Sequence, residues 1–395
     1  MIRTKVAAFA AALLTLSVTA TATTGVAAAA GTEPVRFTLP EPSGPYKIGT
    51  VSLHLVDESR KDPWVTTPRK RELMVSLWYP ARDVRRRPLA PWMPRAAADR
   101  YLGYLGLAPG GVTFGRTHGH EQAPVDRSLG RLPVVLYSPG ANASRSFGTG
   151  VVEDLASHGY VVVTMDHPYD AAVVEFPGGR VAMNPDGEIT DFEKAVAVRA
   201  DDTRFVLNQL AMLQAGRNPD ADHQKLPVGL QDTLDLRQIG MFGHSLGGAA
   251  TANAMYADRR IKAGMGLDGA ALGPVVEGGL DRPYLVVDTP GKGGMGTNPM
   301  LRKFWSNLRG WRLNLTLNGA AHNSFGDDAL LLPVVAPLLK LSTQELQEMV
   351  GTIPTARALA FQRAYPRAFF DLHLRHRGHL LDGPSSRFPE VKYTG

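Results

Sequence analysis

Residues 238–250 constrain the fold of this chain more than any other stretch. They contain the pentapeptide G-H-S-L-G at 243–247, a G-x-S-x-G pattern. An apolar run at 239–242 precedes it, and small and apolar residues at 246–256 follow it with helical character. A serine on a sharp turn between a strand and a helix is a nucleophile elbow, and its glycines remove side chains that would clash there. The pattern therefore predicts that Ser245 stands exposed at a helix N-terminus, where the helix dipole favours developing negative charge.

From residue 132 onward, segments of strand and helix character alternate. Strands that alternate with helices indicate an α/β fold, in which helices cover both faces of a mostly parallel central sheet. Upstream, 46–56 and 71–79 have alternating apolar residues and predict antiparallel edge strands. Besides the elbow, the predicted strands are 132–137, 160–165, 263–267, 284–287 and the last one, 311–317, and the predicted helices are 146–158, 195–213 and 299–308.

Residues 1–30 have the composition of a signal peptide. Two basic residues near the start precede an apolar run at 6–18, and the alanines at 28–30 resemble a cleavage site. The apolar run is shorter than the roughly 20 residues of a membrane span, and no other stretch is long enough. We therefore expect a secreted protein whose mature chain, residues 31–395, forms a single catalytic domain.

Composition excludes several kinds of site. The 395-residue chain contains no cysteine, which excludes disulfides, a thiolate nucleophile and cysteine-ligated metal. Its net charge of +6 is modest for this length and does not indicate nucleic-acid binding. His118, His120 and Glu121 are close in sequence, but no fourth ligand is apparent, so a solvated loop is favoured over a metal site. We expect neither a metal nor an organic cofactor.

Three further segments lie outside the alternating pattern. Residues 80–131 are rich in proline, glycine and arginine, lack a clean strand pattern and contain one short amphipathic helix near 92–105. Residues 170–190 are predicted to be an irregular insertion. The tail at 355–377 is predicted to be helical, with an apolar stripe that packs on the core. The tail histidines are expected on a solvated basic face: His373, His376 and His379.

Chain order selects the base that would activate Ser245. A serine hydroxyl needs a histidine within hydrogen-bond reach, and that histidine is oriented by a buried carboxylate. The order in this fold is serine, acid, histidine. His322 lies in a loop of small residues just after the last predicted strand, where the base is expected. Asp268 and Asp288 each follow a predicted strand, and sequence order alone does not choose between them.

Two backbone amides are expected to form an oxyanion hole. One belongs to Leu246, the residue after the nucleophile. The other should come from the loop after the first central strand, S-P-G-A-N at 138–142. Because Pro139 has no N–H group, the turn at Gly140 is expected to present the amide of Ala141.

These motifs resemble those of the plasma-type platelet-activating-factor acetylhydrolases and related bacterial secreted lipases, which have the α/β-hydrolase fold. The resemblance extends from about residue 78 to the C-terminus. Besides the elbow, it is carried by W-M-P at 92–94, Y-S-P-G-A at 137–141, D-H at 166–167, G-L-D at 266–268 and H-N-S-F at 322–325.

The resemblance implies a choice of acid. In that family the acid follows the strand after the elbow helix, which corresponds to Asp268 rather than Asp288. The chain departs from the family at Pro139, where the family usually has a histidine followed by glycine, and this difference bears on substrate preference.

The sequence thus predicts a serine carboxylic-ester hydrolase that acts through an acyl-enzyme on lipid-like esters, with acetyl to medium acyl chains cleaved best. Aromatic, apolar and basic residues at 92–107 suit either a lid or contact with a lipid interface. The alternatives are a polyester hydrolase resembling cutinase, a peptidase of the same fold, and a catalytically inactive secreted binding protein.

Overall fold

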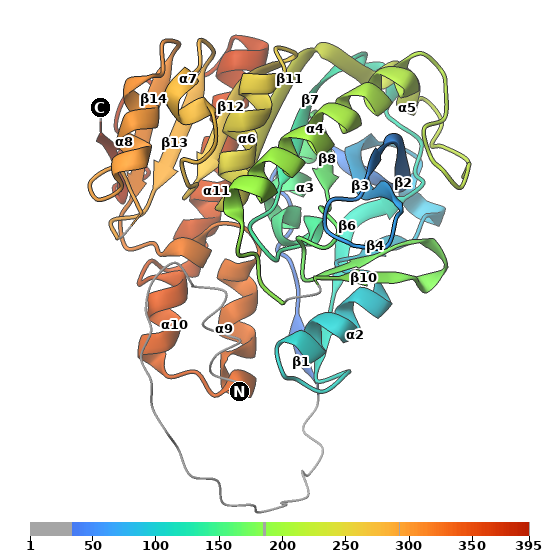
Figure 1. Cartoon of the computed structure of the whole chain (residues 1–395), viewed down its shortest axis with the longest axis horizontal. Coiled ribbons are helices and arrows are strands. Elements are labelled where there is room, and N and C mark those ends of the chain that lie inside the picture. The colour runs from blue at the N-terminus through green and yellow to red at the C-terminus, as the bar shows by residue number, and fades with distance from the viewer. Residues whose placement is uncertain (1–33, 185–186, 292, 395) are drawn as a thin grey trace, which may run out of the picture.

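The computed structural model describes residues 34–184, 187–291 and 293–394. The predicted signal peptide lies outside these residues. A large mixed sheet dominates the structure, with the strand order β15-β14-β13-β12-β11-β7-β8-β3-β2-β6-β4 (Figure 1). Within the described residues, no helix is both long and apolar enough to cross a membrane.

The middle of the sheet is parallel, as the alternating pattern predicts. Its strands are almost entirely buried and apolar, because helices cover both faces. This confirms the α/β-hydrolase fold class. The parallel strands are β7 (Leu132–Ser138), β8 (Val161–Met165), β11 (Leu234–His244), β12 (Ile261–Leu267), β13 (Tyr284–Asp288) and β14 (Arg312–Leu317).

Helices pack on the two faces of this parallel region. On one face lie α4 (Phe192–Gln214), α6 (Leu246–Ala257) and α8 (Pro299–Ser306), which share an apolar core with the inner strands. On the other face lie α3 (Thr149–Ser157) and α11 (Thr355–Arg375) (Figure 1). The elbow helix α6 contacts both β11 and β12, so it is fixed between the nucleophile strand and its neighbour.

The antiparallel edge is larger than the sequence suggests. The two predicted edge strands are β2 (Lys47–Lys61) and β3 (Lys70–Ala81), which pair with each other. The connection at 80–131, in which no clean strand pattern is visible, contributes β6 (Arg116–Glu121), parallel to β2, and β4 (Leu89–Pro91), antiparallel to β6. The sequence does not indicate β6, because RTHGHE has no apolar alternation and the strand is recognised only by its backbone pairing.

The rest of that connection forms a helix and a short strand. The predicted amphipathic helix is confirmed as α2 (Arg95–Tyr104), and β5 (Val112–Phe114) pairs in parallel with β1 (Val35–Phe37). The insertion at 170–190 is not wholly irregular, since β9 (Val173–Glu175) and β10 (Val181–Met183) form an antiparallel pair.

The C-terminal part extends beyond the predicted last strand. After β14 come α9 (Asp328–Leu339), α10 (Thr343–Val350) and, past α11, a further strand β15 (Val391–Thr394). The sheet therefore ends at β15, which pairs antiparallel to β14, and not at the segment predicted to be its last strand. The tail helix α11 packs on the core as predicted. The short helices α5 (Leu230–Thr233) and α7 (Val275–Gly278) complete the α-helices among the described residues.

One tail histidine lies apart from the predicted basic face. His376 and His379 are exposed, as expected. The His373 ring instead packs against Trp311 and Phe369, with ring centroids 4.4 and 4.8 Å away. Burial lowers the pKa of His373 to about 4, so this ring is neutral and belongs to the packed side of α11.

Candidate active site

Ser245 occupies a strained turn between β11 and α6. Its backbone has φ 55° and ψ −122°, a conformation that side chains of L-residues rarely adopt. A Cβ atom on Gly243 would lie 2.2 Å from the backbone of Gly247, and one on Gly247 would lie 2.0 Å from the carbonyl oxygen of Ser138. The Ser245 amide donates a 2.9 Å hydrogen bond to the Leu267 carbonyl on β12. The glycines and this bond together hold the predicted nucleophile elbow.

The structure brings His322 and Asp268 together. His322 begins the short 3₁₀ turn after β14, and its Nδ1 lies 2.5 Å from Oδ2 of Asp268, the residue after β12. Asp268 is anchored in turn, because its Oδ1 accepts from the amide and the hydroxyl of Thr289 at 3.1 and 3.2 Å. Burial opposes ionisation of Asp268, but the hydrogen bond and charge of His322 hold the net pKa of its carboxyl below the ordinary value.

Asp288 has other partners. Its Oδ1 accepts from the Thr316 hydroxyl at 2.6 Å, and its Oδ2 accepts from the Met295 amide at 2.8 Å. These bonds tie the end of β13 to β14 and to the following loop. Of the two carboxylates that sequence order left open, the one within hydrogen-bond distance of His322 is therefore Asp268.

His244, which the sequence analysis did not single out, supports the His322 turn. Its Nε2 donates a 2.8 Å hydrogen bond to the His322 carbonyl, and the two ring centroids lie 4.7 Å apart. Burial and the nearby His322 lower the pKa of His244 to about 3, so it stays neutral near pH 7. His244 directly precedes the nucleophile, so this bond links the elbow to the turn that carries the candidate base.

The side chain of His322 is open to approach. It is 38% exposed, whereas the side chain of Asp268 is 10% exposed. The turn around it is anchored from behind, since Ser324 Oγ accepts from the Ala321 amide and donates to the Val350 carbonyl at the end of α10. An accessible imidazole on a fixed turn, bound through Nδ1 to a carboxylate, can exchange a proton through Nε2.

The predicted oxyanion loop lies against the elbow. A Cβ atom on Gly140 would lie 3.5 Å from that of Ser245, and Ala141 packs on the apolar cluster that contains Leu246. Leu246 is the first residue of α6, so its N–H has no acceptor within the helix. The structure thus brings Ala141 and Leu246, the two residues with predicted donors, into one apolar cluster next to the nucleophile turn.

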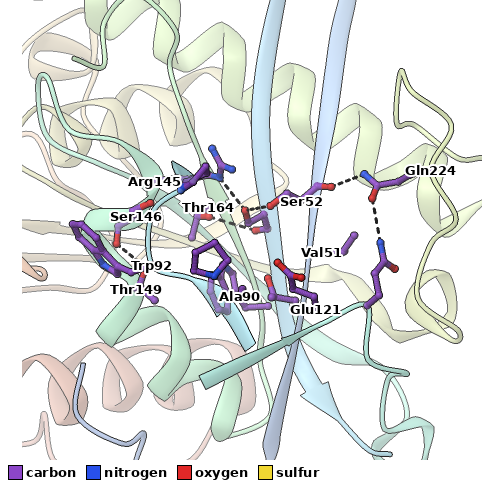
Figure 2. A pocket seen from close by; sticks show the side chains of 16 residues that line it. Val51, Ser52, Ala90, Trp92, Glu121, Arg145, Ser146, Thr149, Thr164 and Gln224 are labelled. Carbon is purple, nitrogen blue, oxygen red and sulfur yellow. Dashed lines mark hydrogen bonds between the residues drawn. The ribbon is translucent and has the colours of Figure 1, made fainter. Parts of the chain in front are cut away.

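A cavity of about 420 Å³ lies elsewhere in the molecule. It opens between β2, β3 and the start of α3, and Figure 2 shows the Arg145, Ser52 and Glu121 side chains around it. Neither Ser245, Asp268 nor His322 lines it. The candidate site is therefore defined by the contacts of these three residues and not by this cavity.

His118, one of the residues considered as a metal ligand, has another partner. His118 lies on β6 rather than in a solvated loop, and its Nδ1 is 2.8 Å from a carboxylate oxygen of Glu153 on α3. The hydrogen bond to Glu153 raises the pKa of His118. In the described parts of the chain, no group of three or more potential ligands is placed to hold a metal ion.

The apolar residues at 92–107 face inward. Trp92, Tyr101 and Leu102 are among those buried between α2, α9 and β1, and the Trp92 indole donates a 2.7 Å hydrogen bond to Asp327. These three side chains are therefore covered and cannot make the lipid contact that was one of the two interpretations of this stretch; lid and lipid contact both stay predictions. Their burial could not be predicted because the sequence does not show that β1 and α9 cover them.

Comparison with known proteins decides the family. The family described as platelet-activating factor acetylhydrolase, isoform II, matches residues 32–367. The chain belongs to this family. A probable 1-alkyl-2-acetylglycerophosphocholine esterase of Arthroderma benhamiae is 33% identical over 93% of this chain and 96% of its own length. The platelet-activating factor acetylhydrolase of Cavia porcellus is 21% identical over 83% of this chain and 78% of its own length.

A solved structure supports the same fold. The ferulic acid esterase of Streptomyces cinnamoneus is similar with a TM-score of 0.77 and 35% identity, covering 90% of this chain and 99% of that one. The esterases and acetylhydrolases among these relatives, together with the shared fold, show that this family member is a carboxylic-ester hydrolase.

Proposed function

We propose that the protein hydrolyses esters through a Ser245–His322–Asp268 triad and an acyl-enzyme. His322 Nε2 takes the proton of Ser245 as its Oγ attacks the ester carbonyl, and the amides of Leu246 and Ala141 hold the oxyanion. His322 then protonates the leaving alcohol, and a water molecule activated by the same ring releases the acid. Asp268 fixes the tautomer of His322 and stabilises the imidazolium that forms.

The hydrogen bond between His322 Nδ1 and Asp268 Oδ2 carries this proposal. At 2.5 Å it is the bond that a general base needs to present Nε2 to a nucleophile. The bond from His244 to the His322 carbonyl ties this pair to the elbow, where the backbone of Ser245 is strained in the way that nucleophile elbows require.

The substrate that we propose is a lipid-like ester with a short acyl group. The relatives that support it are named for a 1-alkyl-2-acetylglycerophosphocholine and for platelet-activating factor. One observation favours a second candidate, an ester of a hydroxycinnamic acid, because the ferulic acid esterase shares 35% of its residues with this chain.

A substrate series separates the two candidates. We would measure kcat/KM for p-nitrophenyl esters from two to sixteen carbons, for a 2-acetyl phospholipid and for methyl ferulate, with Ser245→Ala as the blank. The lipid proposal predicts the highest values for the phospholipid and the acetyl to medium-chain esters. A clear preference for methyl ferulate would replace it with the second candidate.

We also propose that the protein is exported and that residues 31–395 form one catalytic domain. The basic start, the apolar run and the alanines at 28–30 support export. N-terminal sequencing of the protein recovered outside the producing cells is expected to begin near Gly31. Recovery of a chain that still starts at Met1 would contradict export with cleavage.

A further inference from the structure

A buried guanidinium lies directly behind the oxyanion loop. Arg199 on α4 has no exposed surface, and it forms two hydrogen bonds to the carboxylate of Asp170, at 2.7 Å from Nε and 2.5 Å from an Nη. The same guanidinium donates to the carbonyl oxygens of Pro139 and Gly140, the latter at 3.0 Å. One buried side chain therefore forms hydrogen bonds to two consecutive peptide groups of the loop that faces Ser245.

The hydrogen bond from Arg199 to the Gly140 carbonyl fixes the direction of the Ala141 N–H. In a trans peptide the C=O of one residue and the N–H of the following residue lie in one plane and point in opposite directions. Because the Gly140 carbonyl points toward the Arg199 guanidinium, the N–H of Ala141 points away from that guanidinium. Gly140 itself lies against the elbow, since a Cβ on it would lie 3.5 Å from the Cβ of Ser245, so the peptide group that Arg199 fixes borders the nucleophile turn.

A second buried hydrogen-bond network holds Ser138, the first residue of the loop. Ser138 Oγ lies 3.0 Å from Nε2 of His167, and Nδ1 of His167 lies 2.9 Å from Oδ2 of Asp202. Asp202 in turn pairs with Arg71 at 2.7 Å. This network has the connectivity of a serine triad, but its three members are at most 1% exposed and substrate has no access to them. The contact of this network with the loop is therefore structural. Arg199 also donates a hydrogen bond to Ser138 Oγ, at 3.4 Å.

We propose that Arg199, oriented by Asp170, is a positioning residue that sets the Ala141 amide for the oxyanion. This inference rests on the proposed ester-hydrolase function and goes beyond it, since it assigns to α4 a part in the reaction without contact with substrate. An amide fixed before the reaction stabilises the alkoxide at no reorganisation cost. An amide free to rotate loses this advantage mainly in the transition state, so kcat should fall and KM should change little.

Arg199→Lys is the direct test. Lysine keeps the charge opposite Asp170 but has no planar fork, so it cannot hold both carbonyls and the carboxylate together. We expect kcat for p-nitrophenyl acetate to fall about 10- to 100-fold, less than or comparable to the loss of one oxyanion donor. The inhibition constant of a trifluoromethyl ketone, which forms a tetrahedral alkoxide on the serine, should rise by a similar factor while KM stays within about threefold.

Arg282→Lys provides a matched control. Arg282 also binds backbone carbonyls, those of Asp258 and Ile261 at 3.0 and 2.7 Å, but at the end of α6 remote from Ser245. The Arg282→Lys variant should be less stable than the wild type, with an unchanged kcat per active site. Asp170→Asn is the second variant, for use if Arg199→Lys does not fold, because it loosens the fork and leaves Arg199 in place. It should lower kcat by a smaller factor in the same direction.

Active-site titration with a fluorophosphonate separates the possible failures. If wild-type Ser245 does not react, the proposed function fails before the inference is reached. If Ser245 reacts in every variant and Arg199→Lys or Asp170→Asn keeps the wild-type kcat and ketone affinity with only a lower Tm, the positioning role is wrong and Arg199 serves stability alone.

Discussion

His322 Nδ1 lies 2.5 Å from Oδ2 of Asp268, although 54 residues separate them in sequence. His322 follows β14 and Asp268 follows β12. Because β13 lies between those two strands, the hydrogen bond reaches across the carboxyl end of β13. Asp288, at the end of β13, is closer to His322 in the sequence but is bound to Thr316 and the Met295 amide. The arrangement gives a direct comparison between two carboxylates at neighbouring strand ends.

Asp268→Asn should lower kcat by on the order of 10⁴-fold, because an amide opposite Nδ1 favours the wrong tautomer of His322 and cannot stabilise an imidazolium. Asp288→Asn should lower kcat less than about tenfold, since its loss affects only the bonds to β14 and the loop. Steady-state kinetics on p-nitrophenyl acetate checks both variants. If kcat fell by the larger factor in Asp288→Asn and Asp268→Asn stayed active, the assignment of the acid would be reversed.

The choice between these carboxylates shows where prediction from sequence ends. The elbow and the parallel strands could be predicted because apolar runs and glycines report local backbone requirements. The base could be proposed because chain order left few histidines. The acid could not be chosen without a family resemblance, because Asp268 and Asp288 have the same local context and differ only in what faces them across the sheet.

The buried charges of α4 illustrate a different limit. Arg199 and Asp202 occupy the same helical stripe as Val196, Thr203 and Val206, all of which are buried. Charged residues at the spacing of an apolar stripe could have indicated a buried network, but their partners come from two other segments, the loop after β8 with His167 and Asp170, and β3 with Arg71. Likewise, β6 and β15 are short and largely polar, so only their pairing with β2 and β14 defines them.

Gly247→Ala tests the packing of the elbow. The added Cβ would lie 2.0 Å from the carbonyl oxygen of Ser138, a backbone atom that cannot move without displacing the oxyanion loop. We expect a loss of unfolding free energy of about 1–3 kcal/mol or more together with reduced activity. Urea denaturation measures the loss of unfolding free energy.

Gly103→Ala is the control for this substitution. A Cβ on Gly103 meets nothing within 4 Å, and the residue lies inside α2. The change should leave the unfolding free energy unaltered or raise it by about 0.5–1 kcal/mol, because glycine is a poorer helix former than alanine. If both alanine variants were equally stable, the tight contact at the elbow would be refuted.

Asp328 should make stability depend on pH. Burial and the neighbouring Asp327 raise its pKa to about 7, and its Oδ1 has no partner within the described structure. Below about pH 4 both folded and unfolded states hold the proton. As pH rises from about 4 to 7 the unfolded state releases it first, so this carboxyl lowers stability over that window. Asp328→Asn, which does not ionise, should raise Tm at pH 8 by the equivalent of roughly 1–3 kcal/mol and change it little at pH 4.

Asp327→Asn is the matched comparison on the adjacent residue. Both oxygens of Asp327 accept hydrogen bonds, from the Gly150 amide at 2.9 Å and from the Trp92 indole at 2.7 Å. An amide at this position would turn one N–H toward another N–H, which costs stability. Burial also raises the pKa of Asp327 to about 7, so its ionisation lowers the stability of the wild type as pH rises, and Asn removes that penalty. Asp327→Asn should therefore lower Tm clearly at pH 4 and by less at pH 8. No loss at pH 4 for Asp327→Asn, or no gain at pH 8 for Asp328→Asn, would contradict the roles given to the two carboxyls.

The nucleophile is the central claim, and intact-mass spectrometry after reaction with a fluorophosphonate tests it most directly. The purified wild-type protein should gain the mass of one phosphonyl group, located by peptide mapping at Ser245, in step with loss of esterase activity. Ser245→Ala should gain none and hydrolyse p-nitrophenyl acetate at least about 10⁴-fold more slowly. Stoichiometric labelling at another residue, or near-wild-type turnover by folded Ser245→Ala, would contradict the account.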